Sequence, residues 1–100
     1  PGLDVEVVPG ELALHIATKR SDVELVRVLL KRARANPDAT NSIGTTPLMV
    51  ACSSSRQSCV VTMVRLLLEA GAKPALTDKA GHTALHIAAH MDLIDVVDML

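Results

Sequence analysis

Apolar residues recur along this chain of 100 residues at the spacings of amphipathic helices. A short helix is predicted from Leu12 to Thr18, where Leu14 and Ala17 are three residues apart. Three longer stripes each predict a second helix: Val23, Leu25, Val26, Leu29 and Leu30; Val61, Val64 and Leu68; and Leu93, Val96, Val97 and Leu100. Two further short helices precede the last two stripes, with core faces predicted at Leu48 and Ala51, and at Leu85, Ala88 and Ala89. The pattern therefore predicts an all-α chain of helix pairs.

Polar residues and glycines indicate where several of these helices begin and end. Ser21 and Glu24 have the S-x-x-E spacing of a capping box, which predicts the start of the first longer helix. Gly71 suits the C-terminal cap of the second longer helix. Asp92 is expected to cap the last one.

A stretch of nine residues occurs three times at the start of the short helices. Residues 81–89 read GHTALHIAA, residues 44–52 read GTTPLMVAC, and residues 10–18 read GELALHIAT. The corresponding positions 12, 46 and 83 are 34 and then 37 residues apart. Thr46 and Thr83 suit the N-cap, and Pro47 suits the first helical position. Such a period predicts a solenoid in which each repeat packs on its neighbours.

This stretch resembles the T-P-L-H-x-A core of the ankyrin repeat. The resemblance implies an all-α ankyrin-repeat solenoid of helix-turn-helix units joined by β-hairpin-like fingers. It divides the chain into the end of a preceding finger (1–10), a first repeat (11–44), a second repeat with an inter-helix insertion (45–81) and a truncated third repeat (82–100). We therefore expect the chain to be part of a longer array, and the fragment to self-associate end to end.

Several positions depart from the family pattern. Met49 stands where the other copies have His15 and His86, so we expect a looser contact between the second finger and its helix. Asn41 replaces the usual finger Asp, and Arg34 stands where a Gly cap is usual. The extra length of the second repeat falls at residues 53–60, which we place in the turn between its helices.

Composition narrows the range of functions. Hydrophobic residues make up 49% of the chain without any Phe, Trp or Tyr, which argues against an aromatic-lined ligand pocket. The formal net charge of −1 gives no overall attraction to nucleic acid or an anionic membrane, and no apolar run is long enough to span a bilayer. With no signal peptide at residues 1–10, Cys52 and Cys59 are expected to be reduced thiols of an intracellular protein, in the cytoplasm, the nucleus or both.

No motif for catalysis accompanies the repeats, so we expect a protein that is not an enzyme and needs no cofactor. His86 and His90 are four residues apart, the spacing of a two-histidine metal site, but residue 87 is Ile where the metalloprotease motif has Glu. The resemblance assigns His86 a structural role instead. We therefore predict neither a metal site nor a small-molecule substrate.

The resemblance places partner binding on the finger tips and the exposed side of the inner helices. The corresponding residues are Glu11, Lys19, Arg20, Ser42, Ile43, Thr45, Ser53, Ser54, Lys79, Ala80, His82, His90 and Met91. Ile43 and Met91 are the apolar members, which gain most from desolvation. The resemblance thus implies a protein–protein interaction scaffold, and the basic members favour a partner with an acidic surface.

Two other functions stay open. Arg27, Lys31 and Arg34 fall on one helical face and could form a convex patch that binds nucleic acid or a phosphoinositide, although no aromatic residue is present to stack on a base. The chain could also be a structural spacer between flanking domains. The triple serine at residues 53–55 and Cys59 could form a regulatory insertion, with a tolerated loop extension as the simpler interpretation.

Overall fold

The computed structural model of the chain describes residues 10–41, 43–54 and 57–100, with the side chains of residues 10–12 and 57 left undescribed. These residues form helices only, without any strand, in three successive pairs. The helices are α2 (Gly10–Lys19), α3 (Val23–Lys31), α4 (Pro47–Cys52), α5 (Gln57–Glu69), α6 (Ala84–His90) and α7 (Ile94–Met99). Of the finger end predicted at residues 1–10, residues 1–9 lie outside the described residues, and Gly10 is the first residue of α2 instead.

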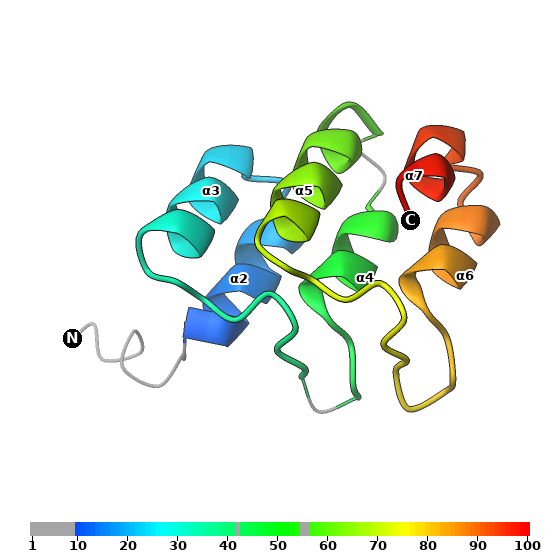
Figure 1. Cartoon of the computed structure of the whole chain (residues 1–100), viewed down its shortest axis with the longest axis horizontal. Helices are drawn as coiled ribbons and strands as arrows, with labels where there is room; N and C mark the ends of the chain where they lie inside the picture. The colour runs from blue at the N-terminus through cyan, green and yellow to red at the C-terminus, as the bar shows by residue number, and fades with distance from the viewer. Residues whose placement is uncertain (1–9, 42, 55–56) are drawn as a thin grey trace.

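The helix pairs stack side by side to form a solenoid. The two helices of each pair contact each other. Each pair also contacts the next, since α2 packs on α4, α4 on α6, α3 on α5, and α5 on α7. Figure 1 shows the resulting inner row of α2, α4 and α6 beside an outer row of α3, α5 and α7, with the fingers projecting from one edge. The all-helical repeat fold predicted from the sequence is therefore confirmed.

The core lies between the two rows and is aliphatic. Leu14, Leu48, Met63 and Leu67 are at most 1% exposed. Small residues such as Ala17 are also fully buried there, which lets neighbouring helices approach closely. The predicted stripes supply much of this core, with Val26, Leu30, Val64, Leu93 and Val96 buried.

Three residues predicted to face the core are exposed instead. Leu85 is 45% exposed, whereas its equivalents Leu14 and Leu48 are at most 1% exposed. Those two are covered by the helix pair that follows, and among the described residues no helix pair follows α6 and α7 to cover Leu85. Ala89 is exposed as well, and Leu25 is 40% exposed.

Both threonines predicted to cap inner helices do so. The Thr46 hydroxyl accepts a hydrogen bond from the Met49 backbone N–H at 3.3 Å, with Pro47 at the first helical position. The Thr83 hydroxyl accepts from the His86 N–H at 3.2 Å, and His86 Nδ1 accepts from the Thr83 N–H at the same distance. These caps satisfy N–H groups that have no partner inside the helix.

The N-caps predicted at Ser21 for α3 and at Asp92 for α7 are wrong. Ser21 and Asp92 have left-handed backbones, with φ of 59° and 61°, and each lies one residue before the N-cap. The N-cap of α3 is Asp22, whose Oδ1 accepts from the Leu25 N–H at 3.2 Å. Glu24 therefore does not close a capping box; it forms an ion pair with Arg27 at 2.8 Å.

The predicted turn at residues 53–60 is wrong from residue 57 onward. α5 begins at Gln57 and has 13 residues, whereas α3 has 9. Val60 is fully buried, so its burial in the core stabilises the added helical turn. Most of the extra length of the second repeat thus lengthens its outer helix, and residues 55 and 56 lie outside the described part.

Candidate protein-binding surface

Each finger bends around one side chain that caps its own backbone. Asn41 Oδ1 accepts hydrogen bonds from the N–H groups of Ile43 and Thr45, at 3.1 and 3.0 Å. The Asn41 N–H in turn donates to the Thr45 carbonyl at 3.2 Å. This arrangement fixes the turn that carries Ile43, whose surface is 62% exposed.

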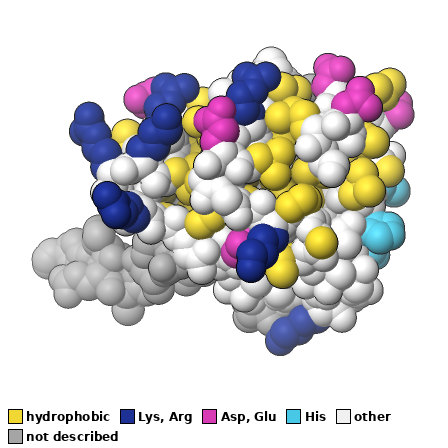
Figure 2. All heavy atoms as spheres, viewed as in Figure 1, with side chains coloured by type: hydrophobic (Ala, Val, Ile, Leu, Met, Phe, Trp, Pro, Cys, Tyr) yellow, Lys and Arg dark blue, Asp and Glu magenta, His cyan; other side chains and the backbone are white. Residues whose placement is uncertain are grey.

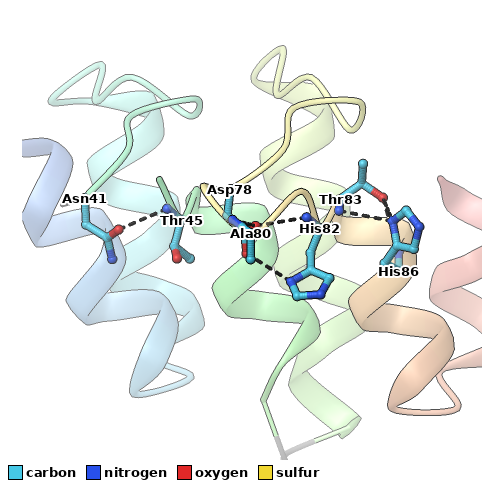
Figure 3. A network of polar contacts seen from close by, with 7 residues as sticks. All are labelled: Asn41, Thr45, Asp78, Ala80, His82, Thr83 and His86. Carbon is cyan, nitrogen blue, oxygen red and sulfur yellow. Dashed lines mark hydrogen bonds and ion pairs between the residues drawn. The ribbon is translucent and has the colours of Figure 1, made fainter. Parts of the chain in front are cut away.

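The second finger repeats this turn with an aspartate. Asp78 Oδ1 accepts from the N–H groups of Ala80 and His82, both at 2.9 Å, and the Asp78 N–H donates to the His82 carbonyl at 2.9 Å. Figure 3 shows the two turns side by side, with the His82 ring turned back toward Asp78. Asn41 therefore performs in the first finger what Asp78 performs in the second.

The two fingers also contact each other, through backbone N–H groups of the second finger that donate to a carbonyl and a carboxylate of the first. The Lys79 N–H donates to the Ile43 carbonyl at 3.1 Å, and the Lys73 N–H donates to Asp38 Oδ1 at 2.8 Å. Gly44 has a φ of 81°, and a Cβ at this position would lie 3.0 Å from the Lys79 nitrogen. Only glycine fits this close approach without strain.

The inner helices hold the fingers from behind. His15 Nε2 lies 2.7 Å from the Thr45 carbonyl, which links α2 to the first finger. Met49, at the equivalent position of α4, is 1% exposed and fills the core. The second finger is held instead by its bonds to the first finger.

Hydrogen bonds lower the pKa of Asp78. The main cause is the His82 backbone N–H, with further contributions from the Ala80 N–H and from the His82 ring, whose Nδ1 lies 3.5 Å from Asp78 Oδ2. The carboxylate therefore stays charged and occupied inside its own finger.

Three histidines line a shallow hollow of about 420 Å³ beside the second finger. His82 comes from the finger, and His86 and His90 come from α6, with Ile87 completing the lining. The rings of His82 and His86 are edge to face, with centroids 6.4 Å apart. We call these four residues the histidine groove.

Comparison with known families identifies the chain. A family model described as "Ankyrin repeats (3 copies)" matches residues 14–100. The chain belongs to the ankyrin repeat family. Ankyrin repeats are generally protein–protein interaction modules and are typically not enzymes.

Curated relatives carry the same repeats within longer proteins. The chain is 42% identical over 80 residues to the E3 ubiquitin-protein ligase KEG of Arabidopsis thaliana, covering 80% of this chain and 5% of the relative. It is 33% identical over 104 residues to the putative ankyrin repeat protein YahD of Escherichia coli, covering the whole chain and 50% of YahD. It is 34% identical over 94 residues to the mouse nuclear factor NF-kappa-B p105 subunit, covering 91% of the chain and 9% of that protein. The chain thus spans half or less of the length of these relatives.

The residues predicted to bind a partner differ in how exposed they are on the ankyrin solenoid. Exposed members are Lys19, Arg20, Ile43, Ser53, Lys79, Ala80, His82 and His90. Thr45 and Ser54 are half-buried, and Met91 is half-buried because it packs against the core. Ser42 and the Glu11 side chain lie outside the described residues.

The structure brings together the finger members Ile43 and Lys79, and it brings the finger residue His82 together with His90 at the end of α6. The Ile43 carbonyl accepts from the Lys79 N–H, so the two finger tips adjoin. Lys19 ends α2 and Arg20 follows it, which places both in the first repeat. Sequence reasoning missed His86 and Ile87 as surface residues, although the four-residue spacing of His86 and His90 was a signal that both share one side of α6.

The part of the chain that the structure describes has few groups that could bind a metal or react. No group of three or more His, Cys, Asp or Glu there is arranged to hold a metal ion, and no described helix is long and apolar enough to cross a membrane. Cys52 and Cys59 are free thiols. Burial raises the pKa of the Cys52 thiol to about 12, which keeps it protonated and unreactive at neutral pH.

Proposed function

We propose that the chain binds a partner protein through its finger tips and the exposed side of α2, α4 and α6. The observation that carries this proposal is the presentation of Ile43. Its side chain is 62% exposed on a turn fixed by Asn41 and by the Lys79 N–H. A large apolar side chain held rigidly before binding loses little conformational entropy when a partner covers it.

The charges near these residues favour an acidic partner. Lys19, Arg20 and Lys79 are exposed cations. Exposed charges of this kind act mainly on the rate of association and are screened by salt beyond about 10 Å at 0.1 M. The two free thiols support an intracellular setting for this interaction.

The test compares two sets of charge-changing variants in affinity capture from cell extract. One variant combines Ile43→Asp with Lys79→Glu on the fingers, and the other combines Arg27→Glu with Lys31→Glu on α3. The proposal expects partners captured by the unaltered chain to be lost with the finger variant and kept with the α3 variant. Equal melting temperatures of the two variants serve as the control for folding.

The reverse result would indicate that the chain binds through the convex basic patch on α3 and not through its fingers. Figure 2 shows Lys and Arg side chains gathered over α3, and Lys31, Arg32 and Arg34 are exposed there. Arg27 is already paired with Glu24 at 2.8 Å, which reduces the free positive charge of this patch. Loss only with the α3 variant would indicate nucleic-acid or phosphoinositide binding, and capture unaffected by either variant would indicate a spacer.

A second copy of the chain is a further proposed partner, through the exposed faces of the first and last helix pairs. Leu85 and Ile94 are 45% and 70% exposed on the last pair, and Ile16 and Leu25 are 47% and 40% exposed on the first. Asp92, Asp95 and Asp98 are exposed at the last pair, while the first carries an excess of Lys and Arg. Both the apolar surface and the charges favour head-to-tail contact.

A further inference from the structure

We propose that copies of the chain join head to tail through an ion pair between Asp92 of one copy and Arg20 of the next. This inference rests on the second copy proposed above as a partner, and it names the contact that joins the two copies. It follows from a hydrogen bond inside the chain that links the turns of two successive helix pairs. The joint between copies repeats the place of that bond, with charged groups instead of hydroxyls.

The turns of the first two helix pairs contact each other. Each turn connects the inner helix of a pair to its outer helix, and the Ser21 Oγ of the first turn lies 3.1 Å from the Ser54 Oγ of the second. Ser21 is only 9% exposed, so the second pair covers this part of the first turn. Stacking of one pair on the next therefore brings these two turn positions within hydrogen-bonding distance.

The same two positions at the ends of the chain carry opposite charges. Ser21 and Asp92 each lie nine residues after the corresponding positions 12 and 83, and both have left-handed backbones one residue before the N-cap of an outer helix. Arg20 and Ser54 each lie eight residues after positions 12 and 46. A second copy that stacks on α6 and α7 as the second pair stacks on the first therefore places its Arg20 beside Asp92.

The surface around Asp92 fits an arginine side chain. A shallow hollow of about 270 Å³ on the last helix pair is lined by Ala89, Asp92, Leu93, Ile94, Val97 and Asp98. Its apolar walls match the aliphatic stem of arginine, and a carboxylate can accept two hydrogen bonds from the guanidinium group. Within the described part of the chain, no Lys or Arg lines this hollow and Asp92 forms no ion pair.

The first turn supplies the matching cation. Arg20 and Lys19 are both exposed, and Arg20 forms no ion pair with any residue that the structure describes. The one carboxylate of this turn is Asp22, whose Oδ1 accepts from the Leu25 N–H and so caps α3. Two cations and one carboxylate leave residues 19–22 with a positive charge, which attracts the acidic end of another copy.

Apolar residues around the ion pair determine the direction of the joint. Ile94 is 70% exposed, whereas its equivalent Val60 is fully buried and lines a hollow with residues of α7. Leu25 is 40% exposed at the opposite end of the solenoid. Because the contact joins two different faces, every copy keeps one face of each kind for a further copy, and the assembly grows as an open chain.

The test exchanges the two charges in sedimentation velocity at low salt. Arg20→Glu and Asp92→Arg should each weaken self-association roughly fivefold or more, since an attractive pair at the joint becomes a repulsive one. An equimolar mixture of the two variants places opposite charges at every joint, so it should associate about as strongly as the unaltered chain. This recovery distinguishes a direct ion pair from a loss of folding.

Two controls accompany the exchange. Arg65→Glu reverses an exposed charge on α5, in the middle helix pair, and should leave self-association unchanged. Circular dichroism melts show whether each variant folds. Where one single variant melts early, the chain that carries both Arg20→Glu and Asp92→Arg replaces the mixture, because it also has opposite charges at each joint.

Three results would overturn the inference: a mixture that associates no more than either variant alone, an equal loss with Arg65→Glu, or a closed dimer that does not grow with concentration. A chain that is monomeric at every concentration would overturn both the ion pair and the second copy as a partner. Association that neither charge reversal changes would overturn only the ion pair. Partner binding through the fingers is decided separately, by capture with the Ile43 and Lys79 variant.

Discussion

Arg34 has a backbone conformation that most residues avoid. Its φ is 52°, in the left-handed region, and the equivalent residue of the second repeat is Gly71 with a φ of 97°. Both precede a buried alanine whose N–H donates to a carbonyl of the outer helix, from Ala35 to Leu29 and from Ala72 to Leu67. The turn after the helix is thus maintained in the first repeat even though the usual glycine is absent.

Replacing Arg34 by glycine should stabilise the chain. The left-handed conformation costs a residue with a side chain about 1–2 kcal/mol, which glycine avoids. Glycine also loses more backbone entropy on folding, which offsets part of this stabilisation. We expect Arg34→Gly to raise the free energy of unfolding by about 0.5–1 kcal/mol. Urea melts measure this, with Arg32→Gly, in a right-handed backbone, as the matched control that should destabilise. A loss of stability on Arg34→Gly would mean that the side chain makes a compensating contact.

Asp78 should make stability depend on acid pH. Its folded pKa is lowered, so its contribution is complete above the ordinary pKa of an aspartate and is lost as the pH falls through the lower folded value. Asp78→Asn keeps the Oδ1 acceptor, as Asn41 does in the first finger, but cannot be protonated in this range.

We therefore expect Asp78→Asn to melt close to the unaltered chain at neutral pH and to lose less stability below about pH 4. Thermal melts between neutral and acid pH provide the measurement. Asp95→Asn on α7 is the control and should keep the acid loss, since Asp95 is exposed and outside the finger. Parallel acid profiles for the Asp78 variant and the unaltered chain would contradict this assignment.

At the scale of elements, the two fingers behave as one unit. Gly44 and Gly71 both have positive φ, so an alanine at either position is strained. At Gly71 no atom lies within 4 Å of an added Cβ, whereas at Gly44 the Cβ would meet the Lys79 nitrogen at 3.0 Å and the Asp78 Cα at 3.2 Å. The difference between the two substitutions therefore isolates the contact between the fingers.

Gly71→Ala should cost about 1 kcal/mol through its backbone alone, and Gly44→Ala should cost about 2 kcal/mol or more. Denaturant melts compare the two stabilities. Hydrogen exchange of the Lys79 N–H, which donates to the Ile43 carbonyl, should accelerate only in the Gly44 variant. Equal costs for both substitutions would show that the fingers do not support each other.

Periodicity and capping residues predicted much of the fold but could not locate every boundary. The stripes and the caps at Thr46 and Thr83 depend on local spacing, which the sequence displays directly. The left-handed backbones of Ser21 and Asp92 carry no glycine to mark them, so the starts of α3 and α7 were misplaced. Burial of Val60 in the core extended α5 through residues that have no local helix signal.

The candidate surface was less accessible from sequence than the fold. Resemblance placed Ile43 and Lys79 on finger tips, but only the folded chain shows that their backbones are bonded. The histidine groove joins His82 of a finger to His86 and His90 of α6. The four-residue spacing of these histidines is a local signal that they share one side.

At the scale of the whole molecule, charge and apolar surface are unevenly distributed along the solenoid. Figure 2 shows acidic side chains near the end formed by α7 and basic side chains over α3. The first and second helix pairs are each covered by the next, as the burial of Leu14 and Leu48 shows. The exposed Leu85 and Ile94 present the same kind of face without such a cover among the described residues.

The chain on its own should therefore self-associate head to tail. Leu85→Lys with Ile94→Lys should shift it toward monomer in sedimentation velocity over a concentration series, because two charges on the last helix pair would have to be desolvated at the contact. Ile43→Lys is the matched control, since Ile43 is 62% exposed but lies on a finger, and it should leave association unchanged. Added salt should weaken association if the acidic and basic ends meet. A chain that sediments as a monomer at every concentration, or a finger variant that dissociates it equally well, would place the contact elsewhere than on these helix faces.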